Sequence, residues 1–523
     1  MKNNFILFLI IGLSILIGYF LGNENEFHYG EIGGDKKINR VERLLNYIEN
    51  DYVERINTDS LIGIVIEDIV NKLDPHSVYI PSFDRQLIVE NMQGKFYGIG
   101  VSFFLVRDTV TVIRVIKDGP SEKAGLLAGD RILIANQDTL YQKKYSADKI
   151  MSVLKGKPGT DVKLKLYRKS EDLIIDVVLK RGKVPLKSVE SSYMLNDSIG
   201  YLKINRFSQT TFNEFESALK KLLSEGMHKI ILDLRDNPGG YLHSAKQISN
   251  SFLSKGQTIV ITKTNTGEQE KSVAKGDGIF QKGHIIILVN EQSASASEIV
   301  AGAIQDNDRG LIIGRRTFGK GLVQKQMPLG GGDAVRLTIA KYFTPSGRSI
   351  QKPYSNNRNE YYNDLNNRFE NGEMADQTKI PIIDSLSYKT PKGRIVYGGG
   401  GIIPDKYVSN QNTKEEQWND LILNSPLTSN FIFDQLDLNR KAYSLLKEGE
   451  LIKNLTPALI PSYEEFYEYC KTKGVEFKNG EKETLKALRA NLALQLFGEN
   501  TFNQIINQGD IFIEKAIKTL DTL

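Results

Sequence analysis

The 523-residue chain contains a single cysteine, Cys470, and therefore has no internal disulfide. Its five histidines form no HExxH pair and no other close pair of ligands, and a cysteine cluster is also absent. A protein-bound metal site is therefore not expected. The GxSxG turn that carries the nucleophile of many serine hydrolases is missing as well.

The sequence also lacks long blocks of one charge. Its net charge is only +5, without a long basic run, which argues against nucleic acid as the main partner. The hydrophobic share of 40% and the charged share of 25% are typical of a globular protein. The length predicts three or four domains.

One long hydrophobic run is present, FILFLIIGLSILIGYFLG at residues 5–22. As a helix it would reach about 27 Å, close to the roughly 30 Å of a bilayer core. Lys2 precedes the run and Glu24 and Glu26 follow it, which places the rest of the chain outside the cytoplasm, in the cell envelope or periplasm. A cleaved signal peptide is the alternative. Because no small-x-small cleavage site closes the run, we favour an uncleaved inner-membrane anchor over 1–22.

Sequence patterns divide the remaining chain into four regions. Apolar residues at helical spacing predict a helical region over 23–90. Short strands punctuated by glycine predict a β-rich module over 91–182. Apolar strands alternate with helices over 183–410, which predicts an α/β core, and a polar surface excursion interrupts it at 354–395. Residues 411–523 are predicted to be helical, with no role evident from the sequence.

The β-rich module resembles a PDZ domain. Three features carry this resemblance: the loop Gly98, Ile99, Gly100 and Val101, the helix-opening PSEKAGL, and GDRILIAN. In a PDZ domain the glycine-rich loop leaves backbone N–H groups free to hold the terminal carboxylate of a peptide, while the peptide adds a strand to the sheet edge. A lone GxG would suggest only a hairpin turn. With all three features present, we predict that these four loop residues bind peptide C-termini.

The stretch GRRTFGK at 314–320 matches the first seven positions of a phosphate-binding P-loop. The next residue is Gly321, where that motif needs Ser or Thr to bind Mg²⁺. Nucleotide binding is therefore not expected, and Lys320 needs another explanation.

Three serines occur in SASASE at 293–298. Ser295 and Glu298 match the S-x-x-E capping box, and most such matches are only helix caps. The alternative is that Ser295 is a nucleophile, which requires a base to take its proton. Without a suitably placed histidine, a lysine would serve if burial lowered its pKa from about 10.4 by roughly 3.

Lys320 meets this requirement in part. It follows Phe318 and Gly319, and the sequence has no acidic residue between Asp308 and Asp333 that would stabilise its ammonium form. The predicted helix 297–306 would point free N–H groups at Ser295, which suits an oxyanion. The glycines of DNPGG, Gly239 and Gly240, would supply further amides after the strand that ends at Arg235.

Taken in order, GIG, GPSEKAGLLAGDRIL, ILDLRDNPGG, VNEQSASASEI, GRRTFGKGLVQ and GGGGIIPD strongly resemble the C-terminal processing, or tail-specific, peptidases. The resemblance covers about residues 36–408. It implies a multidomain α/β fold: a crotonase/ClpP-like protease core with an inserted PDZ domain and helical N- and C-terminal regions.

Matched to the family's motifs, Ser295 is the nucleophile and Lys320, 25 residues later, is the base. Gln324 matches the residue that orients this lysine. The resemblance assigns the oxyanion amides to Ala296 and Gly239. No cofactor is implied.

The resemblance implies a serine endopeptidase that holds protein C-termini in its PDZ domain and cleaves or degrades exported proteins. The N-terminal helices resemble those that the family uses for self-association, so a homo-oligomer is implied, and an adaptor protein is a further partner consistent with the family. The alternative is a non-catalytic PDZ adaptor or scaffold on a protease-like fold. Loss of the serine, lysine or glutamine would favour that alternative, and all three are present.

Overall fold

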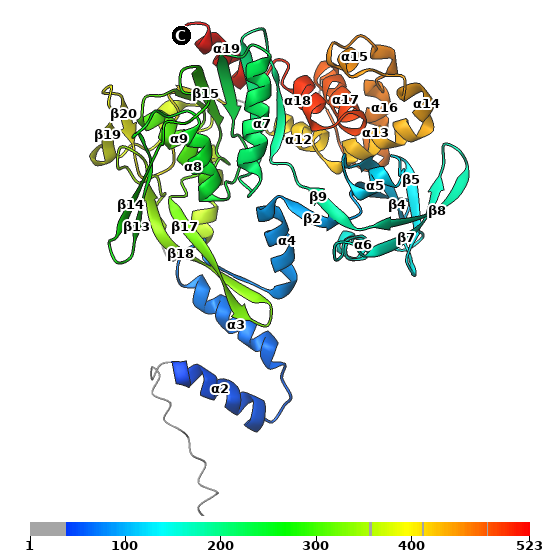
Figure 1. Ribbon diagram of the computed structural model, residues 1–523, viewed down its shortest axis with the longest axis horizontal. Helices are drawn as coiled ribbons and strands as arrows, with labels where there is room; N and C mark the ends of the chain where they lie inside the picture. Colours follow the sequence, from blue (N-terminus) through cyan, green and yellow to red (C-terminus); the bar gives the residue numbers. More distant parts are fainter. Residues whose placement is uncertain (1–37, 355–357, 411–412, 479) are drawn as a thin grey trace, which may run out of the picture. The chain divides into compact units, whose positions relative to one another are not determined.

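The structure is a computed structural model that describes residues 38–354, 358–410, 413–478 and 480–523 (Figure 1). The predicted anchor at 1–22 lies outside these residues. The chain divides into two units, Met1–Ile69 and Val70–Leu523, which are treated separately below. Within the described ranges, no helix is both long enough and apolar enough to cross a membrane.

The first unit contains helix α2 (Ile38–Asp51) and most of helix α3 (Thr58–Asn71), as the helical spacing predicted. Apolar side chains of α2 stay exposed in the single chain, with exposed fractions of 46% for Val41, 57% for Leu44 and 53% for Tyr47. Contiguous exposed apolar side chains are typical of surfaces that pack against a partner.

The second unit begins with a short strand, β1 (Val78–Ile80), inside the region that the sequence predicted as helical. It pairs with β18 (Asp333–Phe343), and three residues are too few for a periodic pattern to show in the sequence. Helix α4 (Ser82–Gln93) follows. Strand β2 (Lys95–Gly98) enters the β-rich module and pairs with β9 (Gly182–Pro185), which leaves it.

The β-rich module is a six-stranded sheet in the order β3-β4-β5-β7-β8, with β6 beside β5. Its strands are β3 (Val101–Val106), β4 (Thr109–Val115), β5 (Asp130–Ala135), β6 (Asp138–Thr139), β7 (Asp161–Arg168) and β8 (Leu173–Lys180). It also contains α5 (Pro120–Lys123) and α6 (Ala147–Leu154), and its core includes Ile99, Val110 and Ile150. Because β3 lies at the edge of the sheet, its free side can pair with another strand.

The α/β core is built on a second six-stranded sheet in the order β10-β11-β12-β15-β16-β21. Its strands are β10 (Val189–Met194), β11 (Ile199–Ile204), β12 (Lys229–Asp233), β15 (His284–Val289), β16 (Leu311–Gly314) and β21 (Lys406–Tyr407). Only the β10–β11 pair is antiparallel; the other four pairs are parallel.

Helices cover both faces of this sheet, which explains why its central strands β12, β15 and β16 are mostly apolar. On one face lie α7 (Thr211–Ser224), α8 (Leu242–Asn250) and α9 (Ala296–Asp306), whose buried side chains share a core with the strands. On the other face, α19 (Ile511–Leu520) packs through Phe512 and Ile513.

A third sheet, in the order β1-β18-β13-β14 with β17 beside β18, completes the core. Its remaining strands are β13 (Thr258–Thr264), β14 (Gln269–Val273) and β17 (Leu322–Gly330). Strands β17 and β18 form a long antiparallel hairpin (Figure 1). The predicted surface excursion contains α10 (Arg358–Tyr362), α11 (Asp364–Glu370) and a small pair of strands, β19 (Ser387–Lys389) and β20 (Ile395–Tyr397).

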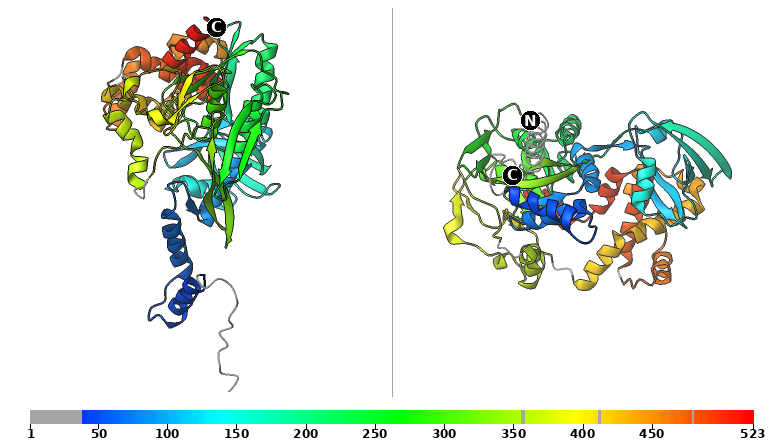
Figure 2. Two further views of the ribbon diagram at one scale, coloured as in Figure 1. Left: turned by 90° about the vertical axis from the view of Figure 1, so that its left-hand side faces the viewer. Right: turned by 90° about the horizontal axis from the view of Figure 1, so that it is seen from below.

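The C-terminal region is helical, as predicted, and has a core of its own. Its helices before α19 are α12 (Lys414–Leu423), α13 (Pro426–Leu438), α14 (Arg440–Tyr443), α15 (Glu448–Ile452), α16 (Tyr463–Thr472), α17 (Glu481–Leu496) and α18 (Glu499–Ile506). They lie beside the β-rich module (Figure 1 and Figure 2), where Arg114 pairs with Glu499 at 2.5 Å. They also contact the core sheet, because Asn500 Oδ1 accepts the Ser192 N–H at 2.9 Å. This region therefore bridges the module and the core.

Candidate active site

The candidate site lies at the carboxyl ends of three neighbouring parallel strands. The loop after β12 carries DNPGG, the loop after β15 carries SASASE, and the loop after β16 carries the FGKG stretch. Loops at this edge of a parallel sheet converge, and ligands of open α/β sheets bind there. Gly239 and Lys320, which lie 81 residues apart in the sequence, are thus brought together by the topology.

A cavity of about 840 Å³ opens between these loops, α4 and the β17–β18 hairpin. Its lining includes all five residues that the sequence assigned to the reaction centre: Gly239, Ser295, Ala296, Lys320 and Gln324. The volume lies within the roughly 300–1,000 Å³ typical of ligand clefts. The four predicted peptide-binding residues of the β-rich module are not part of this lining.

Ser295 precedes the first residue of α9 and has an unusual backbone, with φ 55° and ψ −110°. A non-glycine residue outside the favoured regions costs of order 1–3 kcal/mol, and such strain is concentrated at functional sites. The loop glycine Gly239 packs directly against this turn. A Cβ at Gly239 would lie 2.8 Å from Ser295 Cβ and 2.9 Å from the Ala296 nitrogen, so only glycine fits there.

The two predicted oxyanion donors differ in their present hydrogen bonding. Ala296 is the first residue of α9, where a helix N–H has no intrahelical acceptor. The Gly239 N–H donates to Asn237 Oδ1 at 2.9 Å. In this conformation, therefore, Gly239 is placed beside Ser295 but its N–H is occupied. The sequence did not single out Asn237, which is fully buried and also donates to the Ile204 carbonyl at 2.8 Å.

Lys320 projects toward Gln324, and its Nζ donates to Gln324 Oε1 at 2.8 Å. Gln324 in turn donates through Nε2 to the backbone carbonyl of His76, which fixes the orientation of the amide. Burial, with the nearby Arg336 guanidinium as the second cause, lowers the pKa of Lys320 to about 8.

Two carboxylates oppose this shift in the Lys320 pKa. Glu298 and Asp74 both act to raise it, but less strongly than burial lowers it. The sequence has no acidic residue between Asp308 and Asp333, so these two counter-charges are not local to Lys320 along the chain. Both acids lie far from Lys320 in the sequence and reach it only through the fold.

The Glu298 carboxylate, which is fully buried, accepts four hydrogen bonds. Oε2 accepts the Ser295 N–H at 2.8 Å and the Lys320 N–H at 2.9 Å. Oε1 accepts the Gly319 N–H at 2.7 Å and the Thr317 hydroxyl. The expected reach of Glu298 back to the Ser295 N–H is present, but the same carboxylate also holds the Lys320 loop.

Of the histidines, His243 lines the cavity, whereas His76 contacts Gln324 through its backbone carbonyl and its ring points elsewhere. Its Nε2 lies 2.7 Å from the Tyr361 hydroxyl, and burial lowers the pKa of His76 to about 3. The ring is therefore neutral at physiological pH, and its carbonyl, not its imidazole, serves the site. Asp74 shapes this turn by accepting the His76 N–H at 2.9 Å and the Ser77 N–H at 3.0 Å.

The excursion that the sequence left without a role braces the lysine loop. Arg368 on α11 donates to the carbonyls of Arg316 and Thr317 at 3.1 Å each and to that of Phe318 at 3.3 Å. Lys352 Nζ lies 4.1 Å from the centre of the Phe318 ring, a cation–π distance. These contacts hold the backbone immediately before Lys320.

The predicted peptide-binding loop lies between β2 and β3. Its Ile99 and Gly100 carbonyls are used internally, accepting from Ser121 and Ile116. Since β3 is an edge strand next to this loop, the geometry suits addition of a peptide strand. Among the described residues, no group of three or more His, Cys, Asp or Glu side chains is arranged to hold a metal ion.

Comparison with known proteins gives matches to the α/β core and to the β-rich module. The model described as peptidase family S41 matches residues 198–356, and the PDZ domain model matches residues 98–179. A carboxy-terminal-processing protease of Bartonella bacilliformis is 34% identical over 320 residues, 60% of this chain and 73% of that protein.

A probable CtpA-like serine protease of Staphylococcus haemolyticus is 34% identical over 319 residues, 60% of this chain. The matched part is 63% of that relative, so the chain spans less than two thirds of its length. The solved structure of a photosystem II D1 C-terminal processing protease aligns at 24% identity over 72% of this chain and 89% of that one, with a TM-score of 0.35.

Proposed function

Because the chain belongs to peptidase family S41, together with carboxy-terminal-processing proteases, we propose that it is a Ser-Lys endopeptidase that recognises the C-termini of exported proteins and cleaves them. The observation that carries this proposal is the hydrogen bond of Lys320 Nζ to Gln324 in the cavity that Ser295 also lines. A lysine with a pKa near 8 in such a place is suited to act as a base.

In the proposed reaction, Ser295 Oγ attacks the scissile carbonyl while Lys320 Nζ takes the hydroxyl proton. The C–N bond then breaks as Lys320 returns that proton to the leaving amine, and an ester remains on Ser295. Lys320 next removes a proton from water, which attacks the ester, and returns that proton to Ser295 Oγ as the ester bond breaks and the new C-terminus leaves. Gln324 holds the lysine amine in position throughout.

The lowered pKa decides how much Lys320 is ready to react. With a pKa of about 8, about one tenth of the side chain is neutral at pH 7, whereas an ordinary lysine would be neutral in fewer than about one molecule in a thousand. Because about nine tenths of the side chain is protonated at pH 7, the rate at that pH is about one order of magnitude below its maximum.

The negative oxygen of the tetrahedral intermediate would be held by the Ala296 N–H at the start of α9. We assign the second donor to Gly239, as the motif suggests. Its N–H must exchange Asn237 Oδ1 for the substrate oxygen when the substrate binds. The exchange leaves the buried Asn237 Oδ1 without this donor, a cost of about 1–3 kcal/mol that the stronger hydrogen bond to the negative oxygen offsets.

The PDZ loop of Gly98, Ile99, Gly100 and Val101 would hold the tail carboxylate, with the substrate strand added beside β3. The hydrophobic run at 5–22 supports an anchor that leaves the rest of the chain outside the cytoplasm. The exposed apolar side chains of α2 support self-association through the N-terminal helices. An adaptor protein remains a further proposed partner.

Peptide cleavage by the intact chain and two variants tests the proposal. Ser295→Ala and Lys320→Ala are expected to lose activity on a peptide with a free C-terminus, and amidation of that C-terminus is expected to slow the wild type. Activity that survives in either variant contradicts the Ser-Lys assignment. A wild type that binds peptide tails without cleaving any of them would favour the adaptor alternative.

A further inference from the structure

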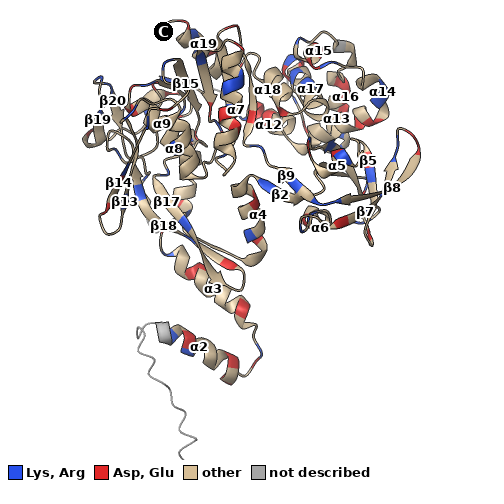
Figure 3. Ribbon diagram, viewed as in Figure 1, with Lys and Arg blue, Asp and Glu red and all other residues tan. Residues whose placement is uncertain are grey.

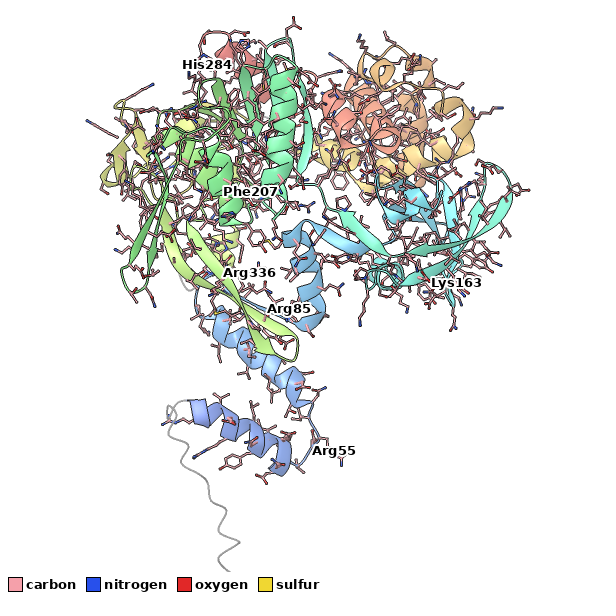
Figure 4. The ribbon with its side chains drawn as sticks, in the orientation of Figure 1. Arg55, Arg85, Lys163, Phe207, His284 and Arg336 are labelled. Atoms are coloured by element: carbon pink, nitrogen blue, oxygen red, sulfur yellow. The ribbon has the colours of Figure 1, made fainter. Side chains whose placement is uncertain are left out.

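The cavity beside Ser295 is lined by cations and by no acid. Besides Lys320, its basic lining residues are Arg85, Arg206, Lys246 and Arg336, and none of the described residues that line it is Asp or Glu. Arg85 comes from α4 and Arg336 from β18; both elements carry Lys or Arg positions in Figure 3, and the two residues are labelled in Figure 4. A cleft lined by one sign of charge attracts groups of the opposite sign.

Among the residues that the structure describes, the three arginines also have no acidic partner. Arg85 donates to the Gly332 carbonyl at 3.0 Å, and Arg206 donates to Asn91 Oδ1 at 3.3 Å and to a backbone carbonyl. The buried Nε of Arg206 has no hydrogen-bond partner. Across the described part of the chain, no ion pair or side-chain hydrogen bond is found for Arg336.

Three other arginines of the core are paired with carboxylates. Arg235 pairs with Asp233 at 2.6 Å, Arg316 with Glu373 at 2.6 Å, and Arg348 with Asp306 at 2.7 Å. The three cavity arginines are half-buried and have no such carboxylate among the described residues, so their charge is available to an incoming anion.

The β17–β18 hairpin shows that Arg336 is directed into the cavity by the strand pleat. Gln326, which pairs with Arg336 across the hairpin, also lines the cavity, as does Gln324 two residues earlier. Successive side chains of a strand point to opposite faces. The intervening Lys325 is accordingly exposed and not part of the lining.

Arg336 is also close enough to the reaction centre to act on its base. Its guanidinium is the second cause, after burial, of the lowered pKa of Lys320. Because Arg336, Lys320 and Ser295 line the same cavity, a group bound by Arg336 would lie in the cavity that holds the reaction centre.

We propose that this peptidase selects substrates with acidic side chains next to the scissile bond. Arg336, assisted by Arg85 and Arg206, binds the carboxylates of these side chains. The planar guanidinium fork matches a carboxylate with two parallel N–H···O bonds. This specificity rests on the proposed function and adds to it a substrate class for the cleavage site itself. The free tail carboxylate is a different anion, assigned above to the PDZ loop.

The test uses matched peptides that share one PDZ-binding tail and differ only in Asp or Glu against Asn or Gln at each position flanking the cleaved bond. For the wild type, we expect kcat/KM to favour the best acidic peptide by about tenfold to a hundredfold, as hydrogen bonds to charged groups predict. This preference should shrink as salt is added.

Variants then assign the preference to residues. Arg336→Gln should reduce the acidic-to-neutral ratio to within about twofold, Arg85→Gln and Arg206→Gln should reduce it in part, and Arg336→Lys should retain much of it. Lys325→Gln is the matched control, because it removes a charge from the same hairpin on the opposite face. Its ratio should equal that of the wild type. The ratio is the readout because Arg336→Gln also changes the base.

Each outcome bears on one of the two proposals. Equal cleavage of acidic and neutral peptides overturns the acidic specificity and leaves the peptidase assignment intact. A preference that survives Arg336→Gln, or that disappears when only the tail is amidated, also overturns it. If no peptide is cleaved, the proposed function fails. Affinities of Ser295→Ala, with and without Arg336→Gln, for the same peptides then test the charge recognition alone, and equal affinity for both peptides would refute it.

Discussion

Glu298 Oε2 accepts the backbone N–H of Lys320 at 2.9 Å, and the same oxygen accepts the N–H of Ser295 at 2.8 Å. One buried carboxylate thus holds the backbone of the proposed nucleophile and of the proposed base, which are 25 residues apart. Glu298 touches no substrate in this account and is a positioning residue. The cost of burying its charge, which raises the pKa of Glu298, is offset by four donors.

The Glu298→Gln variant tests this role. An amide keeps one acceptor but turns an NH₂ group toward N–H donors, so we expect activity to fall by at least about a hundredfold and the fold to lose roughly 2–5 kcal/mol. Glu416→Gln is the control, because Glu416 reaches back to the Thr413 N–H in an exposed capping box on α12. It should cost no more than about 1 kcal/mol and leave kcat unchanged. If the two variants lost similar amounts of activity and stability, Glu298 would act only as a helix cap.

The pH profile should report the lowered pKa of Lys320. Because the neutral amine is the active form, kcat/KM should rise about tenfold per pH unit below pH 8 and level off above it. Arg336 lowers this pKa, so Arg336→Gln should move the whole rise to higher pH. Lys325→Gln should leave the profile where it is. A profile that is flat between pH 6 and 9 would exclude Lys320 as the base.

The strained backbone of Ser295 predicts a difference between two inactive variants. Glycine adopts φ 55° and ψ −110° without strain, whereas alanine does not. Glycine gains more entropy than alanine on unfolding, which offsets part of this advantage. Ser295→Gly should therefore be more stable than Ser295→Ala by roughly 1 kcal/mol. Urea unfolding followed by fluorescence would measure it. Equal stability, or a less stable glycine variant, would mean that the turn stores no strain.

The excursion at 354–395 should matter for the rate although it lies outside the cavity. Arg368→Gln removes guanidinium donors to three successive carbonyls before Lys320, so we expect a lower kcat and faster amide hydrogen exchange in residues 316–320. KM should change little because no substrate contact is lost. Lys379→Gln, an exposed substitution in the same excursion, is the control. Unaltered exchange in Arg368→Gln would rule out the bracing role.

Much of the site was predictable because its motifs are short and local. SASASE, FGKG and DNPGG each identify a residue by its immediate neighbours, and the structure brings Ser295, Lys320 and Gly239 into one cavity. The helix after Ser295 followed from its apolar spacing and is confirmed as α9.

The features of the site that the sequence did not reveal depend on contacts between residues that are distant in the sequence. Glu298 matched a capping box because only its contact with Ser295 is local, while Thr317, Gly319 and Lys320 meet it through the fold. The effects of Asp74 and Arg336 on Lys320 likewise come from other elements. The occupied N–H of Gly239 depends on a side-chain orientation that no motif encodes.

The most direct test of the account is the rate at which a fluorophosphonate, which reacts with activated serine hydroxyls, labels the intact chain at different pH values. We predict one adduct, located by mass spectrometry on Ser295, with a labelling rate that is half-maximal near pH 8 and reaches a plateau above it. Labelling should be absent in Ser295→Ala and at least about a hundredfold slower in Lys320→Ala. Labelling of another residue, or of Ser295 at an unchanged rate in Lys320→Ala, would contradict the Ser-Lys mechanism.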